Sequence, residues 1–214
     1  MTRRKVDLRF TEVGYELMVL AQYITLLEAN LPTVVDAEKR RVWVDLDPDD
    51  DADRQIGHHL EDRLDQGVTT RFLAGAAMIA TWAIYEATVS QMADYVRDQK
   101  EVSLRMSRLK GDFLERARTY YDDVLKFDLH PLGTDWTRLQ RLAELRHLIA
   151  HANGRLWDVP GEDRKRLESW IKSTAGLSIV GDEYVVVSLD FVRQSHTFVD
   201  GLLKDLVDRV RDAF

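Results

Sequence analysis

The chain has 214 residues, 45% of them apolar and 31% charged, which is typical of a soluble globular protein with one sizeable domain. It contains no cysteine, so disulfides and thiolate metal sites are excluded. The net charge of −7 argues against nucleic-acid binding by the chain as a whole. The charge is uneven, however, since residues 36–53 hold eight acidic and three basic residues, whereas residues 138–172 hold eight basic and five acidic ones. A local basic surface is therefore compatible with this acidic chain.

No segment reads as a secretory signal or a membrane span. The N-terminus, MTRRKVDLRF, is basic but leads into no long apolar run and no small-residue cleavage site. The most apolar segment, residues 72–89, is interrupted by Thr81, Glu86 and Thr88 and falls short of a membrane span. We therefore expect a cytoplasmic protein with no membrane partner.

Apolar residues at three- and four-residue spacing predict a helix over residues 10–31, ended by Pro32. Residues 32–53 then read as a loop that is strongly acidic, with a short alternation at Val42 and Val44. The spacing of its aspartates resembles the start of a calcium loop, but Asp50 stands where that loop requires glycine and Ile56 where it requires glutamate. We interpret this helix and acidic loop as an N-terminal appendage, and the acidic loop as solvated.

A long helix is predicted over residues 68–99, with a helical turn before it at residues 52–65. Its middle, FLAGAAMIATWAIYEATV, is apolar nearly all round, which predicts the central buried helix. Glu86 lies inside this run, where an unpaired carboxylate is costly. Two interpretations stay open for Glu86: a place on a half-exposed edge, or support of an arginine or histidine on a neighbouring helix.

The rest of the chain predicts further helices and one hairpin. Asp112 caps a helix that runs to about Phe127, and Thr134 or Asp135 caps the next helix, Trp136 to His151. Asn153-Gly154 supplies the left-handed residue that commonly closes a helix. A charged helix over 161–174, a hairpin formed by GLSIV and YVVVSL, and a last helix over 191–211 capped by Asp190 complete the chain. The predicted fold is a single all-α domain over residues 1–214, a helical bundle with one small C-terminal β-hairpin.

The segment ELRHLIAHANGRL, residues 144–156, carries more ionisable groups than packing requires. Residues three, four and seven apart share a helix face, so Glu144, His147 and His151 line one side. This permits a metal triad, because imidazole and carboxylate ligands suit zinc or iron. Leu148, however, stands where the zinc-protease pattern requires glutamate, and no second Glu-x-x-His exists in the chain for a di-iron site. We therefore expect no metal and no cofactor.

The second interpretation makes Arg146 and His151 the working pair. A guanidinium is suited to gripping a phosphate, and an imidazole that titrates near neutrality can move a proton, as phosphodiester chemistry requires. Five residues apart on one helix, the two side chains diverge by roughly 140°. A two-fold homodimer whose axis passes beside this helix would bring both groups of both chains to one cleft.

The run from Glu144 to His151, followed by Gly154, resembles the motif of the HEPN domain superfamily. The order of elements from about Phe72 onward is also similar: a long apolar helix with a late glutamate, a glycine-started helix, the motif helix, a hairpin and a last helix. The resemblance implies an all-α dimer. Many members are metal-independent endoribonucleases of toxin–antitoxin, phage-defence or RNA-processing systems, and others have lost catalysis and bind nucleotides or proteins.

Carried over by position, Arg146 and His151 match the two defining residues of the motif, and His147 stands where the family often has asparagine. The resemblance implies attack by the RNA 2′-hydroxyl on the adjacent phosphate, with His151 as general base or acid and Arg146 stabilising the phosphorane. His147 would bind phosphate or orient the nucleophile, and Glu144 would hold the guanidinium, with Glu86 and Asn153 in supporting places. The implied partners are RNA, a second copy, and an antitoxin or other regulatory protein. Two alternatives stay open: an inactive binding module, and purely structural roles for these residues.

Overall fold

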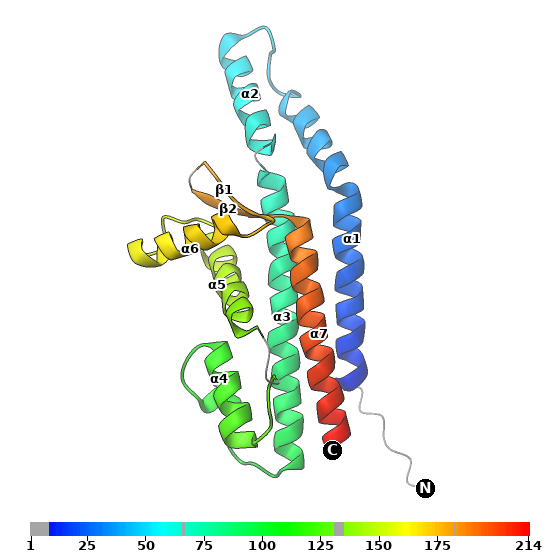
Figure 1. The fold of residues 1–214 in the computed structure, drawn as a ribbon. Helices are drawn as coiled ribbons and strands as arrows, with labels where there is room; N and C mark the ends of the chain where they lie inside the picture. Colours follow the sequence, from blue (N-terminus) through cyan, green and yellow to red (C-terminus); the bar gives the residue numbers. More distant parts are fainter. Residues whose placement is uncertain (1–8, 66, 131–134, 182) are drawn as a thin grey trace. The chain divides into compact units, whose positions relative to one another are not determined.

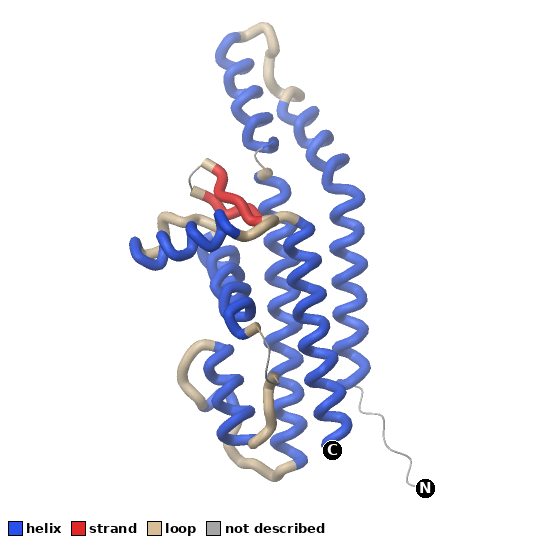
Figure 2. Tube along the Cα trace, in the orientation of Figure 1, coloured by secondary structure: helices blue, strands red, loops and turns tan. Residues whose placement is uncertain are grey.

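The structure, a computed structural model, describes residues 9–65, 67–130, 135–181 and 183–214. Its described part is a helical bundle with one small antiparallel hairpin near the C-terminus, which confirms the predicted fold class (Figures 1 and 2). The chain divides into two compact units. Unit 1 comprises Met1–Leu20, Ala80–Glu144 and Ser195–Phe214, and unit 2 comprises Ala21–Ile79 and Leu145–Gln194. Because the two are interleaved along the chain, neither is one continuous segment, and the single-domain organisation stays a prediction.

Unit 1 is built around aromatic residues that are buried together with their polar atoms. It contains parts of α1 (Arg9–Val42), α3 (Val68–Gln99), α5 (Trp136–Ala152) and α7 (Leu189–Ala213), with η1 (Met106–Arg108), α4 (Phe113–Thr119) and the π-helical turn η2 (Tyr120–Leu125). The Tyr121 hydroxyl donates to the Val89 carbonyl (2.7 Å), and His196 Nε2 donates to the Leu17 carbonyl (3.0 Å). Pairing of this kind is needed because a buried polar group without a partner costs free energy.

Two predicted helix starts in unit 1 are confirmed by their capping hydrogen bonds. Asp112 accepts a hydrogen bond from the Glu115 backbone N–H (2.9 Å), and Asp135 accepts one from the Arg138 backbone N–H (2.8 Å). Each carboxylate satisfies a backbone donor that has no partner within its helix. The alternative cap, Thr134, lies outside the described residues.

The predicted end of the first helix at Pro32 is wrong, and so is the loop over residues 32–53. Helix α1 continues through Pro32 to Val42, and α2 (Asp51–Asp65) starts soon afterwards. Proline removes one backbone hydrogen bond and crowds the preceding turn. The following segment, DAEKRRV, is nevertheless rich in strong helix formers, and its end packs against α2. Only residues 43–50 form the connection between the two helices.

Trp43 holds α1 and α2 together within unit 2. Its indole Nε1 donates to Glu61 (2.9 Å), and Lys39 forms an ion pair with Asp65 (2.5 Å). The hydrogen bond to Asp65 raises the pKa of Lys39. Gly57 is buried under the Trp43 ring, and a Cβ at position 57 would overlap ring atoms. The absence of a side chain at Gly57 therefore sets how closely the two helices approach.

We expect Gly57→Ala to lower the free energy of unfolding by about 1–3 kcal/mol, because the methyl group displaces the Trp43 ring from its partner. The measurement is urea unfolding followed by circular dichroism. Gly201→Ala is the matched control, since a Cβ at this helical glycine has no atom within 4 Å, and alanine there should stabilise the protein by about 0.5–1 kcal/mol. Equal effects of the two substitutions would contradict the role assigned to Gly57.

Helix α3 has the bounds predicted from the sequence, Val68–Gln99. Its core residues, among them Ala74, Met78, Trp82, Tyr85 and Val89, are buried as predicted, whereas Phe72 and the alanines at 76, 83 and 87 are exposed. Two helical segments, Phe10–Val42 and Asp51–Gln99, are long and apolar enough to cross a membrane. The core helices of soluble proteins also meet these criteria of length and composition. The absence of a membrane partner therefore stays a prediction.

Unit 2 contains the hairpin and the helix that precedes it. Strands β1 (Leu177–Val180) and β2 (Tyr184–Val187) form the predicted hairpin, and they pair antiparallel with Leu177 opposite Val187. Helix α6 (Gly161–Ser173) lies against β1 and buries Leu167 and Ile171 (Figure 1). The start of α7 differs from the prediction, because Ser188, not Asp190, accepts the hydrogen bond from the Phe191 backbone N–H (3.1 Å). Asp190 lies inside the first turn and bonds Arg193 and Gln194 instead.

Candidate functional site

The C-terminal half of α5 presents the motif residues on a helix that is anchored by its apolar side. Leu145 and Leu148 are buried. Ile149 lies against Gly75 of α3, where an added Cβ would be only 3.1 Å from its Cγ2 atom. Glycine at position 75 therefore lets α5 pack closely onto α3 inside unit 2. This packing fixes the rotation of the helix and hence the direction of its polar residues.

His147 and His151 are exposed and lie side by side. Their ring centroids are 4.6 Å apart, with an angle of 48° between the ring planes. The prediction that the two imidazoles share a helix face is thus confirmed. A phosphate can reach both rings from solvent, and two imidazoles can carry a proton to and from the same reacting group.

Arg146 lies between the exposed histidine face and the buried face of the helix. Its side chain is half-buried, and its Nε atom is shielded from solvent. Because Arg146 and His151 are five residues apart on one helix, their side chains leave the helix axis in directions that differ by roughly 140°.

The two glutamates predicted to support the site have partners in unit 1. The Arg141 guanidinium donates to Glu144 (2.7 Å), and the Trp82 indole donates to Glu86 (2.8 Å). Both carboxylates are half-buried. That Glu144 or Glu86 also positions Arg146 stays a prediction. In the described part of the chain, no three His, Asp or Glu side chains come together as a metal site.

The turn after α5 binds the helix end to the hairpin. Asn153 and Gly154 have positive φ values of 51° and 76°, which confirms the predicted left-handed helix end. The Gly154 carbonyl accepts from the Val185 backbone N–H (2.9 Å), and the Leu156 N–H donates to the Glu183 carbonyl (2.8 Å). A Cβ at Gly154 would lie 3.1 Å from the Val185 carbonyl oxygen. The end of α5 that carries His151 is therefore held by backbone hydrogen bonds.

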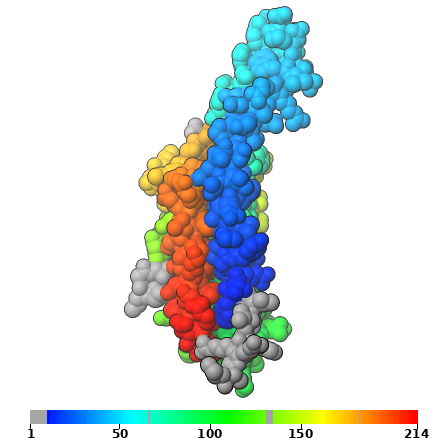
Figure 3. Space-filling model, turned by 90° about the vertical axis from the view of Figure 1, so that its right-hand side faces the viewer, coloured from blue at the N-terminus to red at the C-terminus, as the bar shows by residue number. Residues whose placement is uncertain are grey.

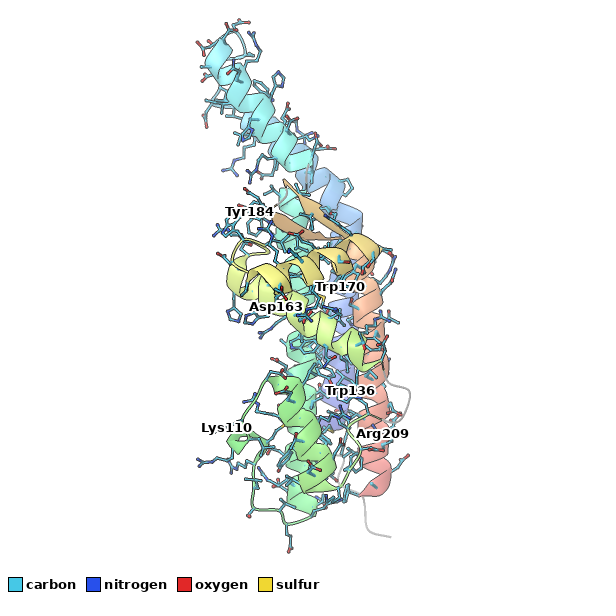
Figure 4. All side chains as sticks on the ribbon, turned by 60° about the vertical axis from the view of Figure 1, so that its left-hand side comes forward. Lys110, Trp136, Asp163, Trp170, Tyr184 and Arg209 are labelled. Carbon is cyan, nitrogen blue, oxygen red and sulfur yellow. The ribbon has the colours of Figure 1, made fainter. Side chains whose placement is uncertain are left out.

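Beside this turn lies a cluster of arginines and aromatic rings that was not predicted from the sequence. The guanidinium of Arg71 lies over the Tyr184 ring (4.1 Å to the centroid), the rings of Tyr184 and Trp157 are 5.5 Å apart, and the Arg155 guanidinium is 5.4 Å from the Trp157 ring. Figure 4 labels Tyr184 on the hairpin. We call Arg71, Arg155, Trp157 and Tyr184 the arginine–aromatic cluster.

The sequence carried one signal for this cluster. Arg155 and Trp157 alternate around the buried Leu156, which is the two-residue period of an extended segment. Arg155 forms an isolated antiparallel bridge with Tyr184, so the segment adds to the open edge of β2. The contribution of Arg71 had no local signal, because it comes from α3, more than eighty residues earlier in the chain.

No protein-family model, no curated protein and no solved structure matches this chain. The resemblance to the HEPN superfamily therefore rests on the motif residues and the order of elements alone.

Proposed function

We propose that this chain is a HEPN-like, metal-independent endoribonuclease that cleaves RNA by attack of the 2′-hydroxyl. The observation that supports this proposal is the grouping at the end of α5. There the ring centroids of the exposed His147 and His151 are 4.6 Å apart, and the half-buried Arg146 is next to His147 in the chain. A helix that needed only to pack would not require three basic groups there.

The proposed chemistry assigns a proton or a charge to each group. His151 takes the proton of the 2′-hydroxyl as that oxygen attacks the phosphorus, and an imidazolium returns a proton to the departing 5′-oxygen. His147 is the nearest group for the second of these tasks. Arg146 stabilises the negative charge that develops on the phosphorane oxygens. The products are a 2′,3′-cyclic phosphate and a 5′-hydroxyl, with no redox change and no external nucleophile.

A second copy of the chain would bring Arg146 and His151 together, although the two side chains diverge within one chain. A two-fold axis beside α5 would place Arg146 of one chain and His151 of the other in the same cleft. The homodimer, an antitoxin or other regulatory partner, and a cytoplasmic location belong to this proposal.

The arginine–aromatic cluster supports RNA as the substrate. Single-stranded RNA is commonly bound by stacking its bases on aromatic rings and guanidinium planes, with phosphates held by basic groups. Trp157 is 46% exposed, and it lies six residues after His151.

The experiment is incubation of the purified protein with single-stranded RNA in excess EDTA, with a DNA of the same sequence as control. We expect cleavage of RNA and none of DNA, because DNA lacks the attacking hydroxyl. Absence of cleavage, combined with saturable nucleotide binding that is lost in Arg146→Ala, would replace the enzyme by the alternative inactive binding module. Absence of both would contradict any role of this motif in nucleic-acid chemistry.

A further inference from the structure

Trp157 leaves a large aromatic surface open to solvent beside a fixed backbone. The chain has five tryptophans, all within the described residues, and Trp157 alone among them is exposed, at 46%. The preceding Leu156 is fully buried, and its backbone N–H donates to the Glu183 carbonyl (2.8 Å). Leu156 therefore anchors this segment to the hairpin without help from the indole. An open indole on a fixed backbone is a suitable platform for a flat ring.

Tyr184 and Arg71 form the packed side of the arginine–aromatic cluster, whose four residues all belong to unit 2. The rings of Tyr184 and Trp157 meet at 69°, so they are in contact but are not stacked face to face. The Arg71 guanidinium lies 4.1 Å from the centroid of the Tyr184 ring, and a Cβ at Gly154 would lie 3.9 Å from Arg71 Cδ. The ring and the turn thus hold one cation next to the aromatic platform.

Both arginines of the cluster lack a carboxylate partner. Among the described residues, neither Arg71 nor Arg155 takes part in an ion pair, and Arg71 Nε is buried without a hydrogen-bond partner. Other arginines of the chain do pair with carboxylates, for example Arg97, Arg164 and Arg209. An arginine without an acceptor in its own chain keeps its N–H donors for a ligand, and a guanidinium fits a phosphate especially well.

Two carboxylates, on Asp158 and Glu183, are close to the cluster in the sequence. Both side chains are exposed, and in the described part of the chain neither pairs with a cluster arginine. They offset the two positive charges, so charge alone attracts an anion only weakly here. A ligand must therefore gain much of its affinity from the indole. This favours a nucleotide, which combines a flat base with a phosphate, over an acidic peptide, which binds through charge.

We propose that the arginine–aromatic cluster is a subsite for one unpaired nucleotide of a single-stranded RNA, with the base stacked on Trp157 and the flanking phosphates bound by Arg155 and Arg71. The subsite selects the substrate through residues that take no part in the proposed chemistry. In a duplex each base is stacked between its neighbours and offers no free face to the indole, so the subsite rejects duplex RNA. The choice of RNA rests on the proposed function, whereas nucleotide binding does not require that the chain cuts.

Binding of a fluorescein-labelled, single-stranded 2′-O-methyl RNA, followed by fluorescence anisotropy, tests the subsite. This probe lacks the attacking hydroxyl, so binding is measured apart from cleavage. Trp157→Ala is expected to weaken binding by about tenfold or more, because stacking of a base on the indole is lost. Trp157→Phe keeps a ring and should retain most of the affinity. The parent should bind the same probe in a duplex about tenfold more weakly or worse. Equal affinity for the two forms, or parental binding by Trp157→Ala, would overturn the proposal.

Tyr23→Ala and Arg40→Gln are the matched controls. They remove a ring that is 40% exposed and an exposed arginine from the same unit. Both residues lie on α1, which is drawn in blue in Figure 3. Each control should bind the probe with the parental affinity. A loss in Tyr23→Ala as large as the loss in Trp157→Ala would show that the effect is not specific to the cluster.

The salt dependence of binding separates the phosphate contact from stacking. For a single strand, the logarithm of the association constant falls with the logarithm of the salt concentration, with a slope of about 0.7 for each phosphate contact. Arg155→Gln should reduce this slope by about 0.7, whereas Trp157→Ala should leave it unchanged. An unchanged slope in Arg155→Gln would contradict the phosphate contact assigned to Arg155.

Tryptophan fluorescence locates the base. A base stacked on an indole quenches its emission, and Trp157 is the exposed tryptophan of the chain. The unlabelled probe should therefore quench the emission of the parent and leave that of Trp157→Phe nearly unchanged, although this variant still binds. Equal quenching in both proteins would place the base elsewhere and overturn the proposal.

Two further ligands test the identity of the occupant. AMP should bind much more weakly than the strand, and equal affinity would assign the cluster to a free nucleotide instead. A poly-glutamate peptide that binds as tightly as the strand, and that loses as much affinity in Trp157→Ala, would assign the cluster to an acidic protein partner.

Cleavage of unmodified RNA distinguishes failure of the subsite from failure of the proposed function. In Trp157→Ala we expect a raised KM rather than a lowered kcat, because the indole binds the strand and moves no proton. A parent that binds RNA through Trp157 but does not cut it would contradict the proposed function and leave the subsite in place. A Trp157→Ala protein that cuts with the parental KM would overturn the subsite and leave the proposed function in place.

Discussion

His151→Ala is expected to lower RNA cleavage by about 10²- to 10⁴-fold, the usual contribution of a general acid or base. The side chain is exposed at the end of α5, so its removal should change the free energy of unfolding by less than about 0.5 kcal/mol. The loss would therefore come from the chemical step and not from the fold. The measurement is the initial rate of cleavage under single-turnover conditions, with circular dichroism to verify folding.

The control for this variant is His59→Ala, which removes another exposed histidine from α2. It should cleave at the parental rate. The cleavage rate of His147→Ala should lie between those of His151→Ala and His59→Ala if the second imidazole assists proton transfer. A His151→Ala protein that cleaves as fast as the parent would remove His151 from the mechanism.

The second large effect is expected at His130, a buried histidine of unit 1. His130 is 7% exposed and shares a 2.9 Å hydrogen bond with the Tyr85 hydroxyl. Among the described residues, its Nδ1 atom is buried with no hydrogen-bond partner. Burial, with a smaller contribution from the charge of Arg209, lowers the pKa of His130 to about 4. The fold therefore holds this imidazole neutral.

This pKa makes the protein sensitive to acid. The unfolded chain takes up the proton near pH 6.5, whereas the folded chain resists it until about pH 4. The contribution of His130 is fully present above about pH 6.5 and is lost as the pH falls toward 4. At 1.36 kcal/mol per pH unit, the maximal loss is about 3 kcal/mol.

Urea unfolding at a series of pH values measures this contribution. His130→Gln keeps a hydrogen-bonding group for Tyr85 but cannot titrate, so its stability should depend less steeply on pH over this range. His59→Gln is the control and should retain the parental slope. Parallel curves for His130→Gln and the parent would show that His130 is not responsible.

The elements predicted from the sequence were those whose signals are local. The long apolar run of α3, the capping aspartates at 112 and 135, and the Asn153-Gly154 helix end each depend on neighbouring residues. Pro32 misled the prediction for α1 because its local preference was outweighed by the helix formers after it and by packing onto α2. The predicted cap of α7, Asp190, was wrong because Ser188, two residues earlier, offers an equivalent side-chain oxygen and accepts the capping hydrogen bond instead.

The candidate site was predictable only where it lies on one helix. Helix geometry placed His147 and His151 side by side and separated Arg146 from them. The arginine–aromatic cluster combines residues from α3, the turn after α5 and the hairpin, and no sequence period connects such distant segments. The same holds for His130 and Tyr85, which are forty-five residues apart.

The most direct test of the proposed mechanism compares two oligonucleotides that differ in one atom. One is all RNA, and the other carries a single 2′-deoxynucleotide at the cleavage position, both incubated with the protein in EDTA. We predict that the first is cut to a 2′,3′-cyclic phosphate and a 5′-hydroxyl, and that the second is not cut at the substituted position. Cleavage at the deoxynucleotide, or a product with a 5′-phosphate, would contradict the assignment of Arg146, His147 and His151 to 2′-hydroxyl chemistry.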